Sequence, residues 1–349
     1  MAHRAGMRNT VKSHLWFVVV TTVLGAMVGV TYTQAIYQGP IGGGLIAGGG
    51  FGAMLALFHL AAAPRLRRFG FAAATALGSL GMTLMTAICL NVSIYGFGLS
   101  DHPAYFDPHS LYLFWFESRW WLDFAFVFGF ALLFNAVISL NELVGQGVLW
   151  PFLIGRYHHP VREERIFLFV DLANSTGIAE RLGDLRFHAL LRGLVDDISD
   201  IIHDHHGRID RYVGDALVIT WPADIGGRDG RCLRCCFAIA ERIAERRAGY
   251  LDQFGVVPHY RAACHVGTVV AGEIGARKRE IMFLGDTVNI TARIEAAAKD
   301  MQRDFLVSGD LLARVPAPSG VEVEALGPFT PRGRSGAIEL FALRAGEAL

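Results

Sequence analysis

Two aspartates stand where strand-like segments end, and they are the first residues of the chain that could do chemistry. Asp171 ends the apolar segment 166–170, and a Leu-Ala-Asn-Ser-Thr sequence leads from it into a helical pattern. Asp215 follows Gly214 between two segments of strand-favouring residues, as in a tight hairpin. Either aspartate alone suits a turn. If their strands are neighbours, the carboxylates converge and suit Mg²⁺ or Mn²⁺ bound together with substrate phosphates.

A third segment, "FLGDTVNITARIEAAAK", adds two groups that suit phosphate chemistry. Asn289 and Arg293 are four residues apart, so they share one face of a helix predicted over 287–299. An arginine held there can stabilise charge that develops on a phosphoryl group, and an asparagine can orient a sugar oxygen. The three segments together favour phosphoryl transfer.

The elements that must position these residues alternate between strands and helices. This alternation predicts an α+β fold, with helices packed on a mainly antiparallel sheet. The predicted elements are strand 164–171, helices over 174–206, hairpin 208–221, helix 228–250, hairpin 259–275, strand 280–284, helix 287–299, and strands 304–308, 321–326 and 336–343.

The first part of the chain has a different composition. The chain of 349 residues is 52% hydrophobic with a mean hydropathy of +0.36, which is too apolar for an ordinary soluble protein. Its formal net charge is zero, so no basic field argues for a nucleic-acid partner. Residues 1–148 hold four apolar segments, each of roughly the 20 residues that cross a bilayer. These four predicted spans are about 14–34, 41–63, 70–96 and 122–148.

Basic residues orient these spans. They flank the ends that the positive-inside rule assigns to the cytoplasm, so we expect a multi-pass protein of the inner (plasma) membrane with its N-terminus and C-terminal domain inside. The aromatic connection 99–121 suits anchoring at the headgroups, or a lid over an unknown ligand. A transporter is disfavoured, because no ionisable residue lies at mid-depth in a span. The basic residues are Arg4, Arg8, Lys12, Arg65, Arg67, Arg68, Arg156, Arg162 and Arg165.

Four ordered segments carry a family resemblance: "FLFVDLANST", "RYVGDALVITW", "HVGTVVAGEIG" and "FLGDTVNITARIE". Residues 160–345, which contain them, resemble the catalytic domain of class III adenylate/guanylate cyclases. The resemblance implies a ferredoxin-like cyclase domain over 164–349, joined by a transducing linker, 149–163, to the membrane domain 1–148.

The resemblance further implies a homodimer whose active sites form across the subunit interface. Asp171 and Asp215 of one subunit would hold two metal ions, Mg²⁺ or Mn²⁺, and the carbonyl oxygen of Leu172 would be a further ligand. Asn289 and Arg293 would come from the other subunit. There, Asn289 would orient the ribose and Arg293 would stabilise the transition state.

The reaction implied is the attack of the ATP ribose 3′-hydroxyl on its own α-phosphorus, which yields cyclic AMP and pyrophosphate. One metal would lower the pKa of the hydroxyl, and the second would neutralise the leaving phosphates. The resemblance assigns the triphosphate to the helix N-terminus formed by Ala173, Asn174, Ser175 and Thr176. Arg332 or Arg334 would bind the terminal phosphates, although a solvent-exposed role fits them equally well.

Base recognition departs from the family's pattern. Adenylate cyclases of this family usually have a Lys four residues before the second metal Asp and an Asp seven residues before the Asn, where this chain has Arg211 and Met282. Arg211 can donate to an adenine ring nitrogen or to guanine O6, whereas Met282 cannot accept the adenine amino proton. The Glu and Cys of guanylate cyclases are absent as well. We predict ATP as substrate, with a guanylate cyclase or a non-catalytic nucleotide receptor as alternatives.

The cysteines are interpreted as packing residues. Cys232 and Cys236 share one helical face, Cys235 lies between them, and no second pair follows at zinc spacing. The odd total of five cysteines indicates reduced thiols.

Two groups of histidines resemble metal ligands. His203, His205 and His206 are interpreted as a solvated helix end, where cations are favourable. His14 and His59 lie near the cytoplasmic ends of two predicted spans, which leaves haem ligation as an alternative.

Overall fold

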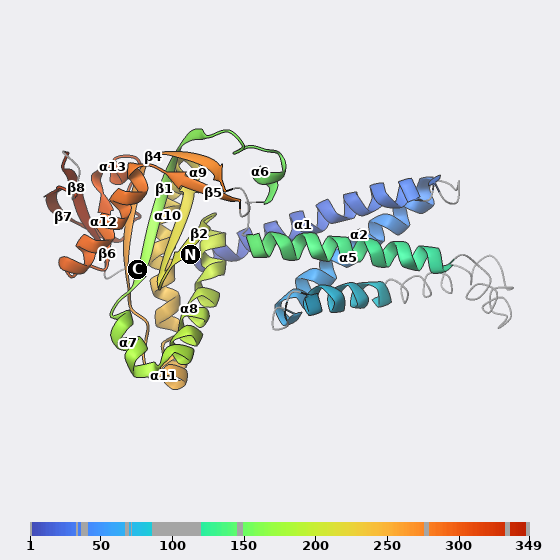
Figure 1. The fold of residues 1–349 in the computed structure, drawn as a ribbon, viewed down its shortest axis with the longest axis horizontal. Coiled ribbons are helices and arrows are strands. Elements are labelled where there is room, and N and C mark those ends of the chain that lie inside the picture. The colour runs from blue at the N-terminus through green and yellow to red at the C-terminus, as the bar shows by residue number, and fades with distance from the viewer. Residues whose placement is uncertain are drawn as a thin grey trace. The chain divides into compact units, whose positions relative to one another are not determined.

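The computed structural model describes residues 2–32, 34–35, 41–66, 70, 72–85, 120–144, 149–275, 279–331 and 336–346 (Figure 1). The chain forms two compact units, Met1–Val144 and Gly145–Leu349.

The first unit contains three long apolar helices, α1 (Ala2–Tyr32), α2 (Ile41–Leu66) and α5 (Trp120–Val144). Each has a stretch long and apolar enough to cross a membrane: Leu15–Tyr32, Gly44–Ala62 and Phe124–Asn141. Three of the four predicted spans are therefore present as helices of membrane-crossing length. The predicted span 70–96 overlaps a shorter apolar helix, Ala72–Met85. The described part of the chain does not include the rest of this predicted span, 86–96, or the aromatic connection up to residue 119. It also does not include residues 145–148.

Glycines allow α1 and α2 to pack with their backbones in contact. A Cβ atom at Gly25 of α1 would lie 2.9 Å from the Gly52 Cα of α2 and would overlap the carbonyl oxygen of Gly48. A Cβ atom at Gly29 would lie 2.6 Å from the Gly48 Cα. Since apolar lipid offers little driving force for helix association, such close packing is what holds helices together in a membrane.

The second unit is built on an eight-stranded sheet in the order β2-β3-β1-β4-β6-β8-β7, with β5 paired to β4. All its ladders are antiparallel except the β4–β6 pair. The predicted α+β fold with a mainly antiparallel sheet is confirmed. The strands are β1 (Val161–Leu172), β2 (Arg208–Val213), β3 (Ala216–Pro222), β4 (Tyr260–Ile274), β5 (Glu280–Leu284), β6 (Phe305–Ser308), β7 (Val321–Phe329) and β8 (Ile338–Ala345).

Helices cover both faces of this sheet (Figure 1). On β1, Ile166, Leu168 and Val170 belong to one core cluster with residues of α8 and α10, whereas Phe167 packs with β5. On β4, Cys264 faces the α10 side and Ala263 faces α12. The helices are α6 (Leu149–Leu153), α7 (Ser175–Leu182), α8 (Asp184–Asp204), α9 (Ala223–Gly227), α10 (Arg231–Glu245), α11 (Arg247–Phe254), α12 (Asp286–Asp300) and α13 (Gly309–Leu312).

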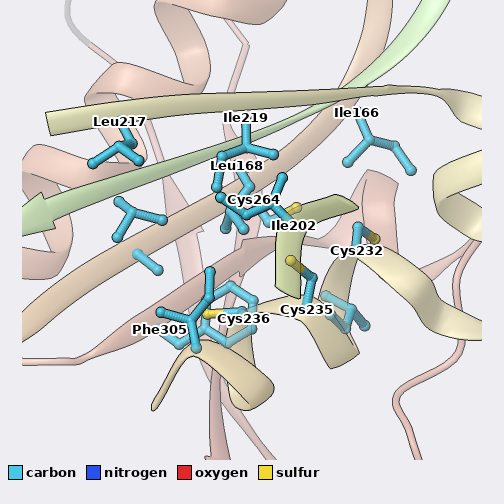
Figure 2. Packing of buried hydrophobic residues seen from close by; sticks show 14 of the residues in the cluster. Ile166, Leu168, Ile202, Leu217, Ile219, Cys232, Cys235, Cys236, Cys264 and Phe305 are labelled. Carbon is cyan, nitrogen blue, oxygen red and sulfur yellow. The ribbon is translucent and has the colours of Figure 1, made fainter. Parts of the chain in front are cut away.

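The four cysteines within the described residues lie in the core, as the packing interpretation of α10 predicted. Figure 2 shows Cys232, Cys235 and Cys236 of α10 packed beside Cys264 of β4 and Ile202 of α8. All four thiols are free and buried. Burial raises the pKa of the Cys236 thiol far above its usual range. Burial also raises the pKa of Cys235 and of Cys264, so these three thiols are poor nucleophiles and poor metal ligands.

Two sequence expectations were wrong. The hairpin predicted over 259–275 is one strand, β4. Gly267 in this strand allows α12 to approach closely, since a Cβ there would lie 2.5 Å from the Thr287 Oγ1 of α12. The residues of the predicted linker 149–163 include helix α6 and the first residues of β1, and their role as a linker stays a prediction. The sequence places Asp286 just before the helix of Asn289, which predicts an N-cap, but it is the first helical residue and Gly285 occupies the N-cap position.

Candidate active site

Sheet register brings Asp171 and Asp215 to the same edge. Val170 of β1 pairs with Leu217 of β3, so Asp171, at the end of β1, lies beside the turn that joins β2 to β3. Gly214 in that turn has a φ of 63°, which lets a two-residue connection place Asp215 next to the first residue of β3. The neighbour of β1 is thus β3, the strand after Gly214, and β2 pairs with β3 in turn.

Asp171 lies in a partly buried setting close to the negative charge of Asp215. Burial raises the pKa of Asp171, and the negative charge of Asp215 raises it further. One carboxylate oxygen of Asp215, Oδ2, is buried and has no hydrogen-bond partner among the described residues. A cation between the carboxylates would remove the repulsion and satisfy this oxygen. The oxygen-only donors fit a hard divalent ion such as Mg²⁺ or Mn²⁺.

Glu295 and Arg261, which the sequence analysis missed, complete the surroundings of Asp171. Arg261 of β4 is the cross-strand partner of Asp171, and its Nε atom is buried with no hydrogen-bond partner in the described part of the chain. Glu295 of α12 shares a hydrogen bond with Asp171. Burial raises the pKa of Glu295 to about 7, assisted by the charge of Asp171 and opposed by that of Lys299.

These acidic groups do not form a self-sufficient metal cage. Across the described ranges, no three His, Cys, Asp or Glu side chains are grouped closely enough to hold a metal ion. The histidines of the α8 C-terminus accordingly show no metal cluster, and His205 Nδ1 lies 2.8 Å from the Ile201 carbonyl oxygen. Two carboxylates would hold the ion only together with other oxygen ligands, such as substrate phosphates.

The segment after Asp171 turns sharply into α7. Leu172 and Ala173 are buried, and the Ala173 amide donates to the His259 carbonyl oxygen at 2.8 Å. Asn174 has a φ of 58°, the left-handed conformation that lets the chain reverse into the helix. Ser175 and Thr176 form the first turn of α7, where backbone amides have no partner inside the helix.

Asn289 and Arg293 lie on α12, with Asn289 exposed and Arg293 half-buried. The Thr287 hydroxyl donates to the Thr268 carbonyl oxygen at 2.8 Å and fixes the start of this helix against β4. Within the described part of one subunit, no recorded contact joins Asn289 or Arg293 to the Asp171–Asp215 pair.

The two base-recognition candidates lie on different strands. Arg211 of β2 donates from Nε to Asp210 Oδ2 at 2.8 Å, and its side chain is 37% exposed. Met282 of β5 is half-buried and pairs with Gly272. Arg332 and Arg334 lie outside the described residues.

The raised pKa of Glu295 predicts a pH-dependent stability. Between its usual value of 4.5 and about 7, the unfolded chain has released this proton while the folded chain retains it. Stability of the metal-free protein therefore falls as pH rises through this window. Glu295→Gln removes the titrating group. In EDTA, the melting temperature of this variant minus that of the wild type should therefore be larger at pH 8 than at pH 4.5. The exposed Glu241, replaced by Gln, is the control; equal behaviour of the two variants would contradict the assignment.

Comparison with known proteins identifies the family of the second unit. The family model described as "Adenylate and Guanylate cyclase catalytic domain" matches residues 159–345. Adenylate cyclase 2 of Rhizobium meliloti (strain 1021) is 46% identical over 210 residues, which are 60% of this chain and 58% of that protein. Adenylate cyclase 1 of the same organism is 30% identical over 208 residues, 58% of this chain and 30% of that protein.

A solved structure shares the fold. The structure of a bacterial light-regulated adenylyl cyclase superposes with a TM-score of 0.53 at 18% identity, covering 62% of this chain and 63% of that one. This likeness concerns the fold alone. The chain spans 58% of the length of Adenylate cyclase 2 and 30% of the length of Adenylate cyclase 1.

Proposed function

We propose that this chain, which belongs to the adenylate and guanylate cyclase catalytic domain family, is a membrane-bound adenylate cyclase that converts ATP to cyclic AMP and pyrophosphate. The convergence of Asp171 and Asp215 at one sheet edge, with a buried carboxylate oxygen left unpaired, is the observation that carries the proposal. The relative that is 46% identical bears the name adenylate cyclase, which supports ATP as the substrate.

Different residues would bind the metal ions and the triphosphate. Asp171 and Asp215, with the Leu172 carbonyl, would hold Mg²⁺ or Mn²⁺, which when bound supply charge neutralisation and activation of the ribose 3′-hydroxyl. The backbone amides at the start of α7, from Asn174 to Thr176, would bind the triphosphate, and Ala173, whose own amide is bonded to His259, would hold this turn in place. Arg261, held opposite Asp171, is placed to balance negative charge there.

Asn289 and Arg293 would act on the site of a second subunit. Because they make no recorded contact with the Asp171–Asp215 pair within the described chain, a homodimer in which α12 faces the partner's carboxylates would complete two sites. Asn289, which is exposed, would orient the ribose. Arg293 would stabilise the charge that develops on the α-phosphorus, a role for which its planar, permanently charged guanidinium is suited.

Substrate choice is tested with the purified full chain in lipid nanodiscs. With Mn²⁺ and equal concentrations of ATP and GTP, cyclic AMP should form faster than cyclic GMP, measured by mass spectrometry. Arg211 keeps donors that also suit guanine O6 and N7, so GTP is the informative competitor. An Asp171→Asn variant controls for contaminating cyclases. A preference for GTP would identify a guanylate cyclase. If neither nucleotide gives a cyclic product, the remaining hypothesis is a non-catalytic nucleotide receptor.

The membrane unit and its connection would carry a signal to this site. We propose that both the N-terminus and the cyclase unit are cytoplasmic, as the flanking arginines indicate. The connection is anchored by Tyr157, whose carbonyl oxygen accepts from the Glu273 amide at 2.9 Å. Tyr157 also packs in one cluster with Ile281 and Phe283 of β5, the strand that carries Met282 and leads into α12.

A change at Tyr157 should therefore act on catalysis. Tyr157→Leu is expected to lower kcat about tenfold with little change in KM, because misplacement of α12 displaces Arg293 without removing a substrate contact. Tyr157→Phe keeps the ring and should stay close to wild type. Steady-state kinetics with ATP measure both. Equal rates for all three proteins would exclude this route.

A further inference from the structure

A groove of about 520 Å³ lies on the face of the sheet opposite Asp171. Its walls come from α10, the start of β4, the connection from α12 to β6, and β8. Tyr260, in this groove, shares the α10 side of the sheet with Cys264, and its hydroxyl donates to the Cys236 carbonyl oxygen at 2.7 Å. The volume is within the range of small-molecule sites.

The groove is apolar inside and basic at its rim. The rings of Phe237 and Phe305 meet edge to face at 5.6 Å, and Ile243 and Leu343 are buried beside them. An aromatic floor of this kind favours a planar apolar ligand.

The rim carries more positive than negative charge. Arg303 and Arg344 share a single carboxylate, Glu324 on β7, at 2.6 and 3.5 Å. Asp304 is engaged by His259 at 2.8 Å. Arg247 is exposed, and no ion pair or hydrogen bond of its side chain is recorded among the described residues. A ligand with one anionic group would find an unused guanidinium at the edge of the aromatic floor.

We propose that this groove binds a small amphipathic organic anion, an aromatic carboxylate in chemical class. Its apolar body would lie over Phe237 and Phe305, and its carboxylate would pair with Arg247. Binding at this site does not depend on the proposed cyclase activity, because none of its lining residues has been assigned a catalytic or substrate contact.

The groove also touches two elements of the candidate active site. Tyr260 immediately precedes Arg261, and Gln302–Asp304 follow α12, which carries Glu295. A ligand that orders these segments would change the positions of Arg261 and Glu295. On the proposed function, it would act as an effector that changes the cyclase rate.

Binding is tested by ¹⁹F NMR with 6-fluoro-2-naphthoate and the full chain in nanodiscs. We expect saturable line broadening with a dissociation constant on the order of 10⁻⁴ M, from the size of the probe. Arg247→Glu should weaken binding at least about tenfold by reversing the charge. Ala240→Phe, which fills the groove, should abolish it. Arg234→Glu, an exposed position on α10 outside the groove, is the matched control and should bind like wild type.

Partition into lipid is the competing explanation, and the neutral alcohol 6-fluoro-2-naphthalenemethanol detects it. Equal broadening by acid and alcohol, unchanged in Arg247→Glu and Ala240→Phe, would overturn the site, as would no binding to the wild type at millimolar probe. Cyclic-nucleotide assays with saturating probe form a separate arm. Binding without any change in rate would overturn the effector role, whereas an inactive chain that still binds would count against the proposed function only.

Discussion

A heterodimer of one subunit with Asp215→Ala and one subunit with Arg293→Ala should be active, although each variant should be inactive as a homodimer. Loss of a metal ligand or of the transition-state arginine is expected to lower the rate by about 10²–10³-fold. In the heterodimer, one site combines both defects. The other combines the intact carboxylates of one chain with the intact Arg293 of its partner, so it is complete.

The heterodimer is obtained by co-expression with two different tags and purification on both. Its cyclic AMP production should be about half that of the wild-type dimer, since one of the two sites of a two-fold dimer works. The matched control pairs Asp215→Ala with Asp171→Ala. Both of those changes fall on the metal-binding side, so every site of that heterodimer lacks a carboxylate. Rescue in the control, or none in the test pair, is incompatible with sites shared between subunits.

Local pattern in the sequence was enough to locate the two carboxylates. An apolar run that ends in Asp171 is a buried strand, and Gly214 before Asp215 specifies a two-residue turn. Both features depend on a few consecutive residues. The unbroken apolar run 166–170 is typical of a strand covered on both faces, and both faces are covered in the structure.

The residues that the sequence did not reveal depend on pairings between distant segments. Arg261 meets Asp171 only because β4 pairs with β1 in one register, and Glu295 does so because α12 lies on the matching face. The hairpin predicted over 259–275 failed for the same reason. Gly267 lies within the single strand that forms instead, and its lack of a side chain makes room for Thr287, twenty residues later in the chain. The Thr287 hydroxyl then donates to the carbonyl oxygen of the neighbouring Thr268.

Adding a single methyl group at Gly48 should separate α1 from α2. A Cβ there would overlap the Gly25 carbonyl oxygen and lie 2.7 Å from the Gly29 Cα, and backbone atoms cannot rotate away as a side chain can. We expect Gly48→Ala to destabilise the membrane unit by about 2 kcal/mol, a typical cost of overpacking, despite the higher helix propensity of alanine.

Gly50 on the same helix provides the matched control, because a Cβ built there meets no atom within 4 Å. Gly50→Ala should leave stability unchanged or raise it by less than about 1 kcal/mol, since only helix propensity then changes. Unfolding of the full chain in mixed micelles of increasing SDS content, followed by circular dichroism, compares the two. If both alanines shift the midpoint equally, α1 and α2 do not pack through their glycines, because only backbone contact between the helices distinguishes these two positions.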